Sequence, residues 1–215
     1  MSSSASGHPS AGPSARTNPT VVPPSGAAPG TYTYDASGTF NAGAPQNVSG
    51  TATLTVDRLS GGQQHSVMKT DRGSTDETLT FPSDGTHLDQ LTLTNAAFTK
   101  TFSPRPSVLL LPAPQKVGST WTWSATSTDG KTTASTTNKI ARMETLTIGG
   151  ETVSCAVVES VLTLSGDLTY RGDTTIWYSA GHRVAVKEHE KGSGNVNGFA
   201  FSSDITSLMR STTPS

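Results

Sequence analysis

The residues with the clearest chemical character are aromatic and aliphatic, and they gather in two stretches. VLLLPAPQKVGSTWTW, residues 108–123, ends in a tryptophan pair spaced i, i+2, and a Trp-Tyr pair follows at 177–178. Such side chains hold apolar ligands by burial, at about 25 cal/mol per Å² of apolar area. The candidate ligand-binding residues are therefore Leu109, Leu111, Trp121, Trp123, Trp177 and Tyr178. The alternative is that they form the core, since aromatic side chains supply much of the buried area of a fold.

Side chains capable of catalysis or metal binding follow no motif. The histidines form neither an H-x-H pair nor an HExxH helix, and they are His8, His65, His87, His182 and His189. The glutamates that flank His189 alternate to the opposite face of a strand. No G-x-S-x-G elbow occurs. We therefore expect no catalytic residue, no metal, no cofactor and no enzymatic activity, although a site assembled from separate strands would leave no motif and stays open.

Three short features have simple structural interpretations. Cys155 is the single cysteine and shares a strand face with Val153 and Val157, which predicts a small buried hydrophobic residue rather than a reactive thiol. Asp167 and Asp173 each follow a glycine, which favours turn positions over a catalytic acid pair. The RGD string at 171–173 is expected to interrupt a strand at a bulge or turn, rather than to act in adhesion.

Composition and charge exclude several classes of protein. The chain has 215 residues, of which 32% are hydrophobic and 14% charged, with a formal net charge of -1. This near-neutral balance gives no electrostatic footprint for nucleic acid. No stretch approaches the roughly 18 apolar residues needed to span a bilayer, and the first residues do not have the pattern expected of a signal peptide.

Residues 1–30 differ from the rest of the chain. They contain six prolines and one charged side chain, Arg16, and are otherwise mostly Ser, Ala and Gly. Such a segment buries too little surface to offset its conformational entropy, so we expect a disordered tether. Tethers of this kind hold folded domains away from a membrane or wall, and this predicts an extracytoplasmic location in the cell envelope or outside the cell.

Residues 31–210 have the pattern of a single β-rich domain. Threonine alternates with Leu, Val, Ile and Trp, and tight turns are expected at Asp84-Gly85, 129–130, Gly149-Gly150 and 180–181. No helical periodicity is sustained over three turns. We predict an all-β antiparallel meander of about nine to twelve strands, forming a half-barrel, barrel or sandwich. Four prolines between residues 104 and 116 could divide it into two lobes, although one continuous sheet is favoured.

From about residue 112 to 188 the chain resembles a loose pattern in bacterial envelope proteins of unknown function. The residues that carry the resemblance are Pro114, Val117-Gly118, Trp121, Trp123, ETLTIGGETV, Trp177-Tyr178 and VAVKE. With its N-terminal segment, the chain resembles an actinobacterial hypothetical surface protein or lipoprotein, and such domains are similar to the curved sheets of LolA- and LolB-type lipoprotein carriers. The resemblance implies an envelope β-domain without catalytic residues. The chain departs from a true lipoprotein because it has no lipid-attachment cysteine.

The sequence thus supports two main functional hypotheses. The first is an extracytoplasmic binding module whose curved sheet holds a lipid or another apolar small molecule. The second is a structural or interaction domain of the cell surface, whose Thr-rich face, such as KTTASTTNK, contacts a cell-surface protein. An enzyme is a third and weaker alternative. The discriminating observation is whether the aromatic residues surround a space or fill a core.

Overall fold

The computed structural model describes residues 25–215, and every regular element in that range is a β-strand. In chain order the strands are β1 (Gly30–Asn41), β2 (Pro45–Val56), β3 (Gln63–Thr70), β4 (Gly73–Thr80), β5 (Gly85–Asn95), β6 (Thr99–Phe102), β7 (Val108–Pro112), β8 (Thr120–Thr126), β9 (Thr132–Ile148), β10 (Glu151–Gly166), β11 (Leu168–Ser179), β12 (Val184–Val196) and β13 (Phe199–Met209). Within this range, no helix has the length and hydropathy needed to span a membrane.

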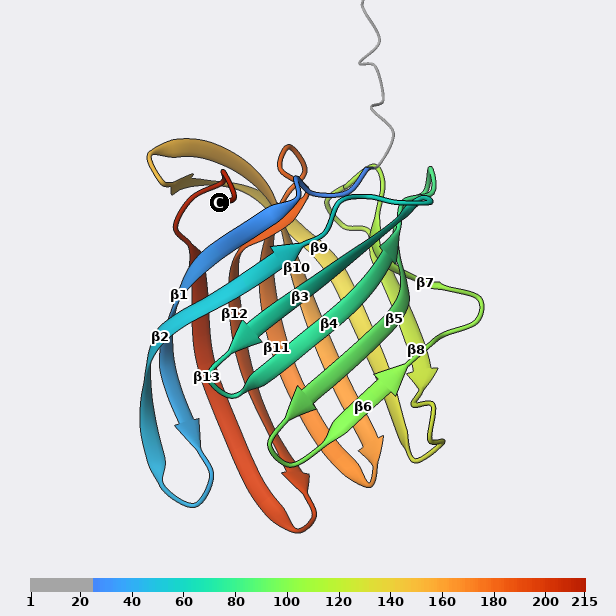
Figure 1. Ribbon diagram of the computed structural model, residues 1–215, viewed down its shortest axis with the longest axis vertical. Helices are drawn as coiled ribbons and strands as arrows, with labels where there is room; N and C mark the ends of the chain where they lie inside the picture. The colour runs from blue at the N-terminus through green and yellow to red at the C-terminus, as the bar shows by residue number, and fades with distance from the viewer. Residues whose placement is uncertain (1–24) are drawn as a thin grey trace, which may run out of the picture.

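All thirteen strands belong to one antiparallel sheet that curls into a nearly closed barrel (Figure 1). The strand order is β6-β5-β4-β3-β2-β1-β13-β12-β11-β10-β9-β8, and β7 pairs with β5 outside this path. The predicted all-β antiparallel meander is confirmed, and closure as a barrel decides between the alternatives. The proline-rich stretch does not separate two sheets, because the short strand β7 pairs within the same sheet.

Hairpin turns form where the sequence predicts them. Gly149 and Gly150 have φ angles of 58° and 88°, the left-handed conformation that a two-residue turn between antiparallel strands requires. The β9–β10 hairpin that they close bends where its register shifts at Val157/Val158. Its tip turns back toward the C-terminal residues, where the Thr212 hydroxyl donates to a Glu151 carboxylate oxygen at 2.5 Å (Figure 1).

The glycines of KGSGNVNG, residues 191–198, predict a flexible segment, and this prediction is wrong as far as Val196. Strand β12 continues through it to Val196, paired on both sides. The glycines are required by packing, because a Cβ at Gly192 would lie 2.2 Å from the Tyr170 hydroxyl, and one at Gly194 would lie 2.8 Å from the Phe201 ring. Glycine in these strand positions makes room for aromatic rings from neighbouring strands.

The buried apolar side chains form three separate clusters. The first apolar cluster includes Tyr32, Tyr34, Ala52, Val56, Ile148, Val153, Cys155, Val157, Trp177, Val184, Val186 and Met209. The second includes Leu88, Leu91, Phe102, Trp123, Ala125, Ala134, Leu164 and Leu168, with Leu110 and Val196 packed against it. The third includes Leu111, Ile140, Ala156 and Val158, with Trp121, Ile176 and Tyr178 packed against it.

The predicted tether, residues 1–30, lies outside the described residues as far as residue 24. From Ala27 onward the chain is attached to the barrel, because the Ala27 amide donates to Gln64 Oε1 at 2.8 Å and Gln64 Nε2 donates to the Ala27 carbonyl at 2.9 Å. The C-terminal residues also join the fold, since the backbone amides of Thr31 and Ser215 each donate to the other's carbonyl at 3.0 Å. The folded unit therefore extends slightly beyond residues 31–210 at both ends.

Candidate functional site

Strand register identifies the inner wall of the barrel. Residues paired directly across antiparallel strands lie on the same face of the sheet. One row of paired residues crosses β2 to β6 and consists of Val56, Ser66, Glu77, Leu91 and Phe102. A second row crosses β2, β1, β13 and β12 and consists of Gly50, Ala36, Ser207 and Glu188. Val56, Leu91 and Phe102 are buried, so this face is the interior.

The inner face of β12 shows that the interior is layered. Val184 and Val186 belong to the first apolar cluster, and Val196 packs against the second. Between them the same face carries Glu188 and Glu190. A band of carboxylates therefore separates two apolar layers inside the barrel. We call Glu77, Glu188 and Glu190 the acidic layer.

The acidic layer is enclosed by protein. Burial, together with the nearby carboxylates of Glu190 and Glu77, raises the pKa of Glu188 to about 7. The pKa of Glu77 is also raised to about 7, first by burial and then by Asp76. Both side chains are nevertheless half-buried rather than fully covered. These carboxyl groups therefore lie on the inner face of the barrel and still reach solvent.

Three hydroxyl groups adjoin these carboxylates, and their hydrogen bonding differs. The Tyr170 hydroxyl donates to Glu190 Oε1, and the Ser203 hydroxyl lies 3.4 Å from the same oxygen. Ser66, paired with Glu77 across β3 and β4, is only 7% exposed. Its hydroxyl takes part in none of the side-chain hydrogen bonds of residues 25–215. Among residues 25–215, this serine and the carboxylates of Glu77 and Glu188 are inward polar groups without a hydrogen-bond or ion-pair partner.

Three aromatic rings form a row on the inner wall beside the acidic layer. The ring of Phe201 stacks against Tyr170 with centroids 6.0 Å apart, and against Phe40 with centroids 6.4 Å apart. The guanidinium of Arg72, from the β3–β4 turn, lies 5.0 Å from the centroid of Phe40. We call Phe40, Phe201 and Tyr170 the aromatic row, and one end of it already carries a cation.

The barrel wall is incomplete beside β2. This strand pairs with β1 along its whole length, but with β3 only over Thr53–Val56. The β1–β2 hairpin thus extends past the β3–β4 turn (Figure 1). On the inner face of the unpaired part, a Cβ added at Gly50 would meet nothing within 4 Å. This part of the interior is open space.

On the other side, the barrel is closed by few interactions between β6 and the end of β8. Phe102 and Ser127 form an isolated bridge, and the Thr128 amide donates to the Thr101 carbonyl at 2.7 Å. Farther along, the Trp121 indole donates to the Leu110 carbonyl at 3.2 Å. These contacts join the two ends of the sheet without a continuous ladder.

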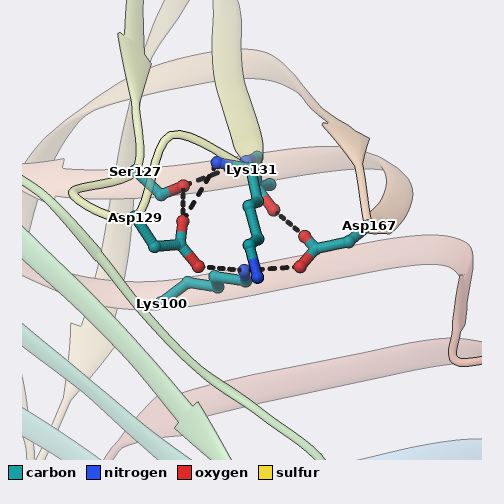
Figure 2. Close-up of polar contacts among 6 residues, drawn as sticks. Lys100, Ser127, Asp129, Lys131 and Asp167 are labelled. Carbon is teal, nitrogen blue, oxygen red and sulfur yellow. Dashed lines mark hydrogen bonds and ion pairs between the residues drawn. The ribbon is translucent and has the colours of Figure 1, made fainter.

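A buried ion cluster reinforces this closure (Figure 2). The amine of Lys100, in β6, lies 2.7 Å from Asp129 in the β8–β9 turn and 2.8 Å from Asp167 in the β10–β11 turn. Ser127 and Thr132 donate to the two aspartates. The aspartates raise the pKa of Lys100, so the amine stays charged and is no nucleophile. We call Lys100, Asp129 and Asp167 the closure cluster, and its role is structural.

The predicted ligand-binding residues do not meet in one place. Trp121, Tyr178 and Leu111 come together in the third apolar cluster, whereas Trp123 belongs to the second and Trp177 to the first. Leu109 pairs with His87 at the β5–β7 edge. The structure therefore brings half of the predicted set together and distributes the rest over other parts of the core. Whether any of them contacts a ligand stays a prediction.

The remaining polar candidates have structural partners. Four of the histidines pair with separate carboxylates, His65 with Asp57 and Asp76, His87 with Asp84, His182 with Glu151 and His189 with Asp204. His8 lies outside the described residues. Within residues 25–215, no group of three or more His, Cys, Asp or Glu side chains is arranged to hold a metal ion. Cys155 is fully buried, and burial raises the pKa of its thiol to about 11. Both observations agree with the predicted small buried hydrophobic residue rather than a reactive thiol.

The RGD string does not interrupt its strand, contrary to expectation. Strand β11 runs through it without a break, and the register shift lies later, at Trp177/Tyr178. Arg171 and Asp173 point outward, 3.6 Å apart, into a shallow hollow of about 490 Å³ that also includes Lys191 and Asp204. Since these charges pair with one another, the hollow favours no ligand of either sign. Gly172 faces inward, where Tyr170 occupies the space of a side chain.

Sequence reasoning missed the acidic layer and the closure cluster, although both leave a signal. Glu188 and Glu190 continue the series of every second residue that begins with the buried Val184 and Val186, so strand periodicity alone places all four on the same face. In the same way, Lys100 stands between Phe98 and Phe102 in FTKTF. A charged residue in phase with buried neighbours is the pattern to recognise. The aromatic row, in contrast, combines three strands and leaves no local signal.

Comparison with known proteins gives distant structural likenesses only. No protein-family description and no curated sequence matches the chain. The hypothetical lipoprotein YmcC from Escherichia coli is 16% identical, with a TM-score of 0.38 over 86% of this chain and 89% of that one. A candidate lipoprotein from Parabacteroides distasonis is 12% identical, with a TM-score of 0.44 over 86% and 95%. A candidate exported protein with a YmcC-like fold from Bacteroides fragilis is 12% identical, with a TM-score of 0.42 over 86% and 96%. At these values the likenesses carry no inference about ligand or activity, and the similarity to LolA- and LolB-type carriers stays a prediction.

Proposed function

We propose that the protein is a non-enzymatic, extracytoplasmic binding module that holds an apolar or lipid-like ligand inside its barrel. The observation that supports this most directly is the set of inward polar groups without protein partners, Ser66, Glu77 and Glu188. A barrel filled only by its own side chains would pair its interior polar groups with one another. A guest molecule or water in the interior explains why these three are left unpaired.

The layering suits an amphiphilic guest. Apolar clusters lie on both sides of the acidic layer along β12. The open space at Gly50 and the incomplete wall beside β2 give such a molecule a route from outside. The extracytoplasmic part of the proposal rests on the Ser-, Pro- and Gly-rich N-terminal composition and the low charge content.

The test is native mass spectrometry of the full chain purified from a bacterial host, before and after extraction with organic solvent. We expect an adduct of lipid mass that is lost on extraction. Gly50→Leu places a side chain in the open part of the interior and should reduce the adduct. Ser49→Leu, on the outer face of the same strand, is the matched control and should leave it unchanged. A bare polypeptide mass in every preparation would refute the proposal.

A protein-interaction domain is the second candidate, and the outer face of β8 and β9 favours it. Paired hydroxyl side chains run along this face as Thr122–Thr137, Ser124–Ser135 and Thr126–Thr133, with the last two hydroxyls 3.4 Å apart. In this case we expect a bare polypeptide mass, together with a cell-surface partner whose cross-linking to the protein is lost in Thr137→Arg and retained in Ser49→Arg.

A further inference from the structure

The acidic layer and the aromatic row are adjacent parts of one surface. Tyr170 belongs to both, because its ring stacks on Phe201 and its hydroxyl donates to Glu190. Ser203 lies on the inner face of β13 between them, 3.4 Å from the same carboxylate oxygen. A molecule inside the barrel that contacts Glu190 would thus lie beside the stacked rings.

No basic side chain of the described chain neutralises Glu77 or Glu188. The basic residues of β12 alternate to the outer face, where the Lys187 amine lies 4.3 Å from the Trp177 ring and Lys191 and His189 pair with Asp204. The inward-facing lysine, Lys100, is held by the two aspartates of the closure cluster.

The neighbouring strands bring no positive charge to Glu188 either. It pairs with Ser207 on β13 and Ile176 on β11, and the nearby ionisable groups are Glu77, Glu190 and Tyr34. The Tyr34 hydroxyl is already engaged as a donor to the Ala185 carbonyl at 2.7 Å.

Two further observations indicate what kind of group would pair with Glu77 and Glu188. Ser66 is more than nine-tenths buried, lies beside Glu77 and makes no side-chain hydrogen bond to another of residues 25–215, so its hydroxyl can donate and accept next to the carboxylate. At the far end of the aromatic row, the Arg72 guanidinium lies over Phe40, which shows that this wall accepts a cation. Carboxylates, a free hydroxyl and aromatic faces together match the chemistry of an ammonium group.

We propose that the acidic layer and the aromatic row bind the positively charged amino group of an amphiphilic ligand, whose apolar part lies along one of the adjoining apolar clusters. This inference rests on the proposed function and names its ligand class. Glu188 and Glu77 accept hydrogen bonds from the ammonium, Ser66 adds a neutral one, and Phe201 offers its face. Tyr170 is a positioning residue, because it holds Glu190 toward the same space.

The magnitude follows from the charge-assisted hydrogen bonds. A hydrogen bond to a charged group contributes enough net free energy to change affinity by about 10- to 100-fold. An alkylammonium should therefore bind at least about tenfold more tightly than the alcohol of the same chain length. Because a protonated Glu188 offers no negative charge, the preference should weaken as the pH falls below about 7.

The experiment is calorimetric titration of the full chain with octylammonium, octan-1-ol and octanoate at about pH 8 and about pH 5.5. The variants are Glu188→Gln, which removes one charge of the layer, Ser66→Ala, which removes the free hydroxyl, and Glu159→Gln, an exposed control of the same type on β10. We expect octylammonium to bind best at the higher pH, with a loss of about tenfold in Glu188→Gln, a smaller loss in Ser66→Ala and no change in Glu159→Gln.

The outcomes separate this inference from the proposed function. If none of the three probes binds, both are refuted. If octan-1-ol or octanoate binds as well as octylammonium, the binding module stands and the selection of an amino group is refuted. If octylammonium binds best but Glu188→Gln and Ser66→Ala bind it as tightly as the parent protein, the amino group lies elsewhere and the assignment to the acidic layer is wrong.

Discussion

The acidic layer should make the barrel less stable as the pH rises, and substitution of Glu188 by Gln tests this. Between pH 4.5 and about 7 the folded protein retains a proton on Glu188 that the unfolded chain has released. The free energy of unfolding therefore falls as the pH rises through this window. Above pH 7 the full penalty is present, and below 4.5 it is absent.

The magnitude can be worked from the two pKa values. A carboxyl whose pKa rises from 4.5 to about 7 on folding costs the folded state about 3 kcal/mol above pH 7, at about 1.4 kcal/mol for each pH unit. Glutamine resembles the protonated glutamic acid in shape and charge. Glu188→Gln should thus exceed the free energy of unfolding of the parent protein by less than about 1 kcal/mol at about pH 5 and by roughly 2–3 kcal/mol at about pH 8.

The assay is urea unfolding at both pH values, followed by tryptophan fluorescence. The comparison between variant and parent removes the contribution of other groups, such as His65, whose raised pKa also makes stability fall as the pH rises. Glu159→Gln controls for the loss of an exposed negative charge and should change stability by less than about 0.5 kcal/mol at either pH. Parallel pH dependence in Glu188→Gln and the parent protein would mean that Glu188 is solvated, and the enclosed acidic layer would be refuted.

Three further substitutions or treatments test other parts of the structure. Lys100→Met leaves two half-exposed aspartates close together without their cation, and because solvent screens them we expect the free energy of unfolding to fall by only about 1 kcal/mol in urea titrations; an unchanged value would show that the closure cluster does not hold the seam. Gly192→Ala forces the Tyr170 ring to move and should cost about 1–3 kcal/mol by the same assay, whereas Gly50→Ala, which meets open space, should cost less than about 1 kcal/mol, and equal losses would contradict the packing account. Cys155 should react with a thiol reagent only in the presence of denaturant, and rapid modification of the native protein would contradict its burial.

The fold was largely predictable because its determinants are local. Alternation of Thr with apolar residues defines the strands, and glycine pairs such as Gly149-Gly150 define the turns, so each hairpin is encoded within about 20–30 residues. The error at residues 191–196 has a non-local cause. Glycine in KGSGNV looks like a flexible segment in the sequence, whereas in the barrel it accommodates rings from β11 and β13.

The site was less predictable because register, rather than residue type, decides which side chains meet. The tryptophans share a residue type but lie in three clusters, since β8 and β11 are separated in the sheet and a register shift at Trp177/Tyr178 changes the facing of β11 relative to β12. Conversely, Glu77 and Glu188 are far apart in sequence and share no motif. Both nevertheless lie on the inner face of the barrel. The strand pairing that runs from β2 to β4 on one side, and from β2 through β1 and β13 to β12 on the other, places them on the same side of the sheet.

The two closures of the barrel differ in a way that bears on ligand access. At the β6–β8 seam, the closure cluster joins three separate parts of the chain through a lysine whose side chain is 8% exposed, and the two aspartates, whose pKa values Lys100 lowers, remain charged at neutral pH. Beside β2, by contrast, two thirds of a strand has no partner on one side, and the Arg72 guanidinium reaches across the gap to the ring of Phe40. A cation–π contact is worth about 0.5–2 kcal/mol, so this side can separate at little cost. A ligand that reaches the acidic layer would therefore pass Arg72, and an ammonium group could replace the guanidinium on the aromatic row as it enters.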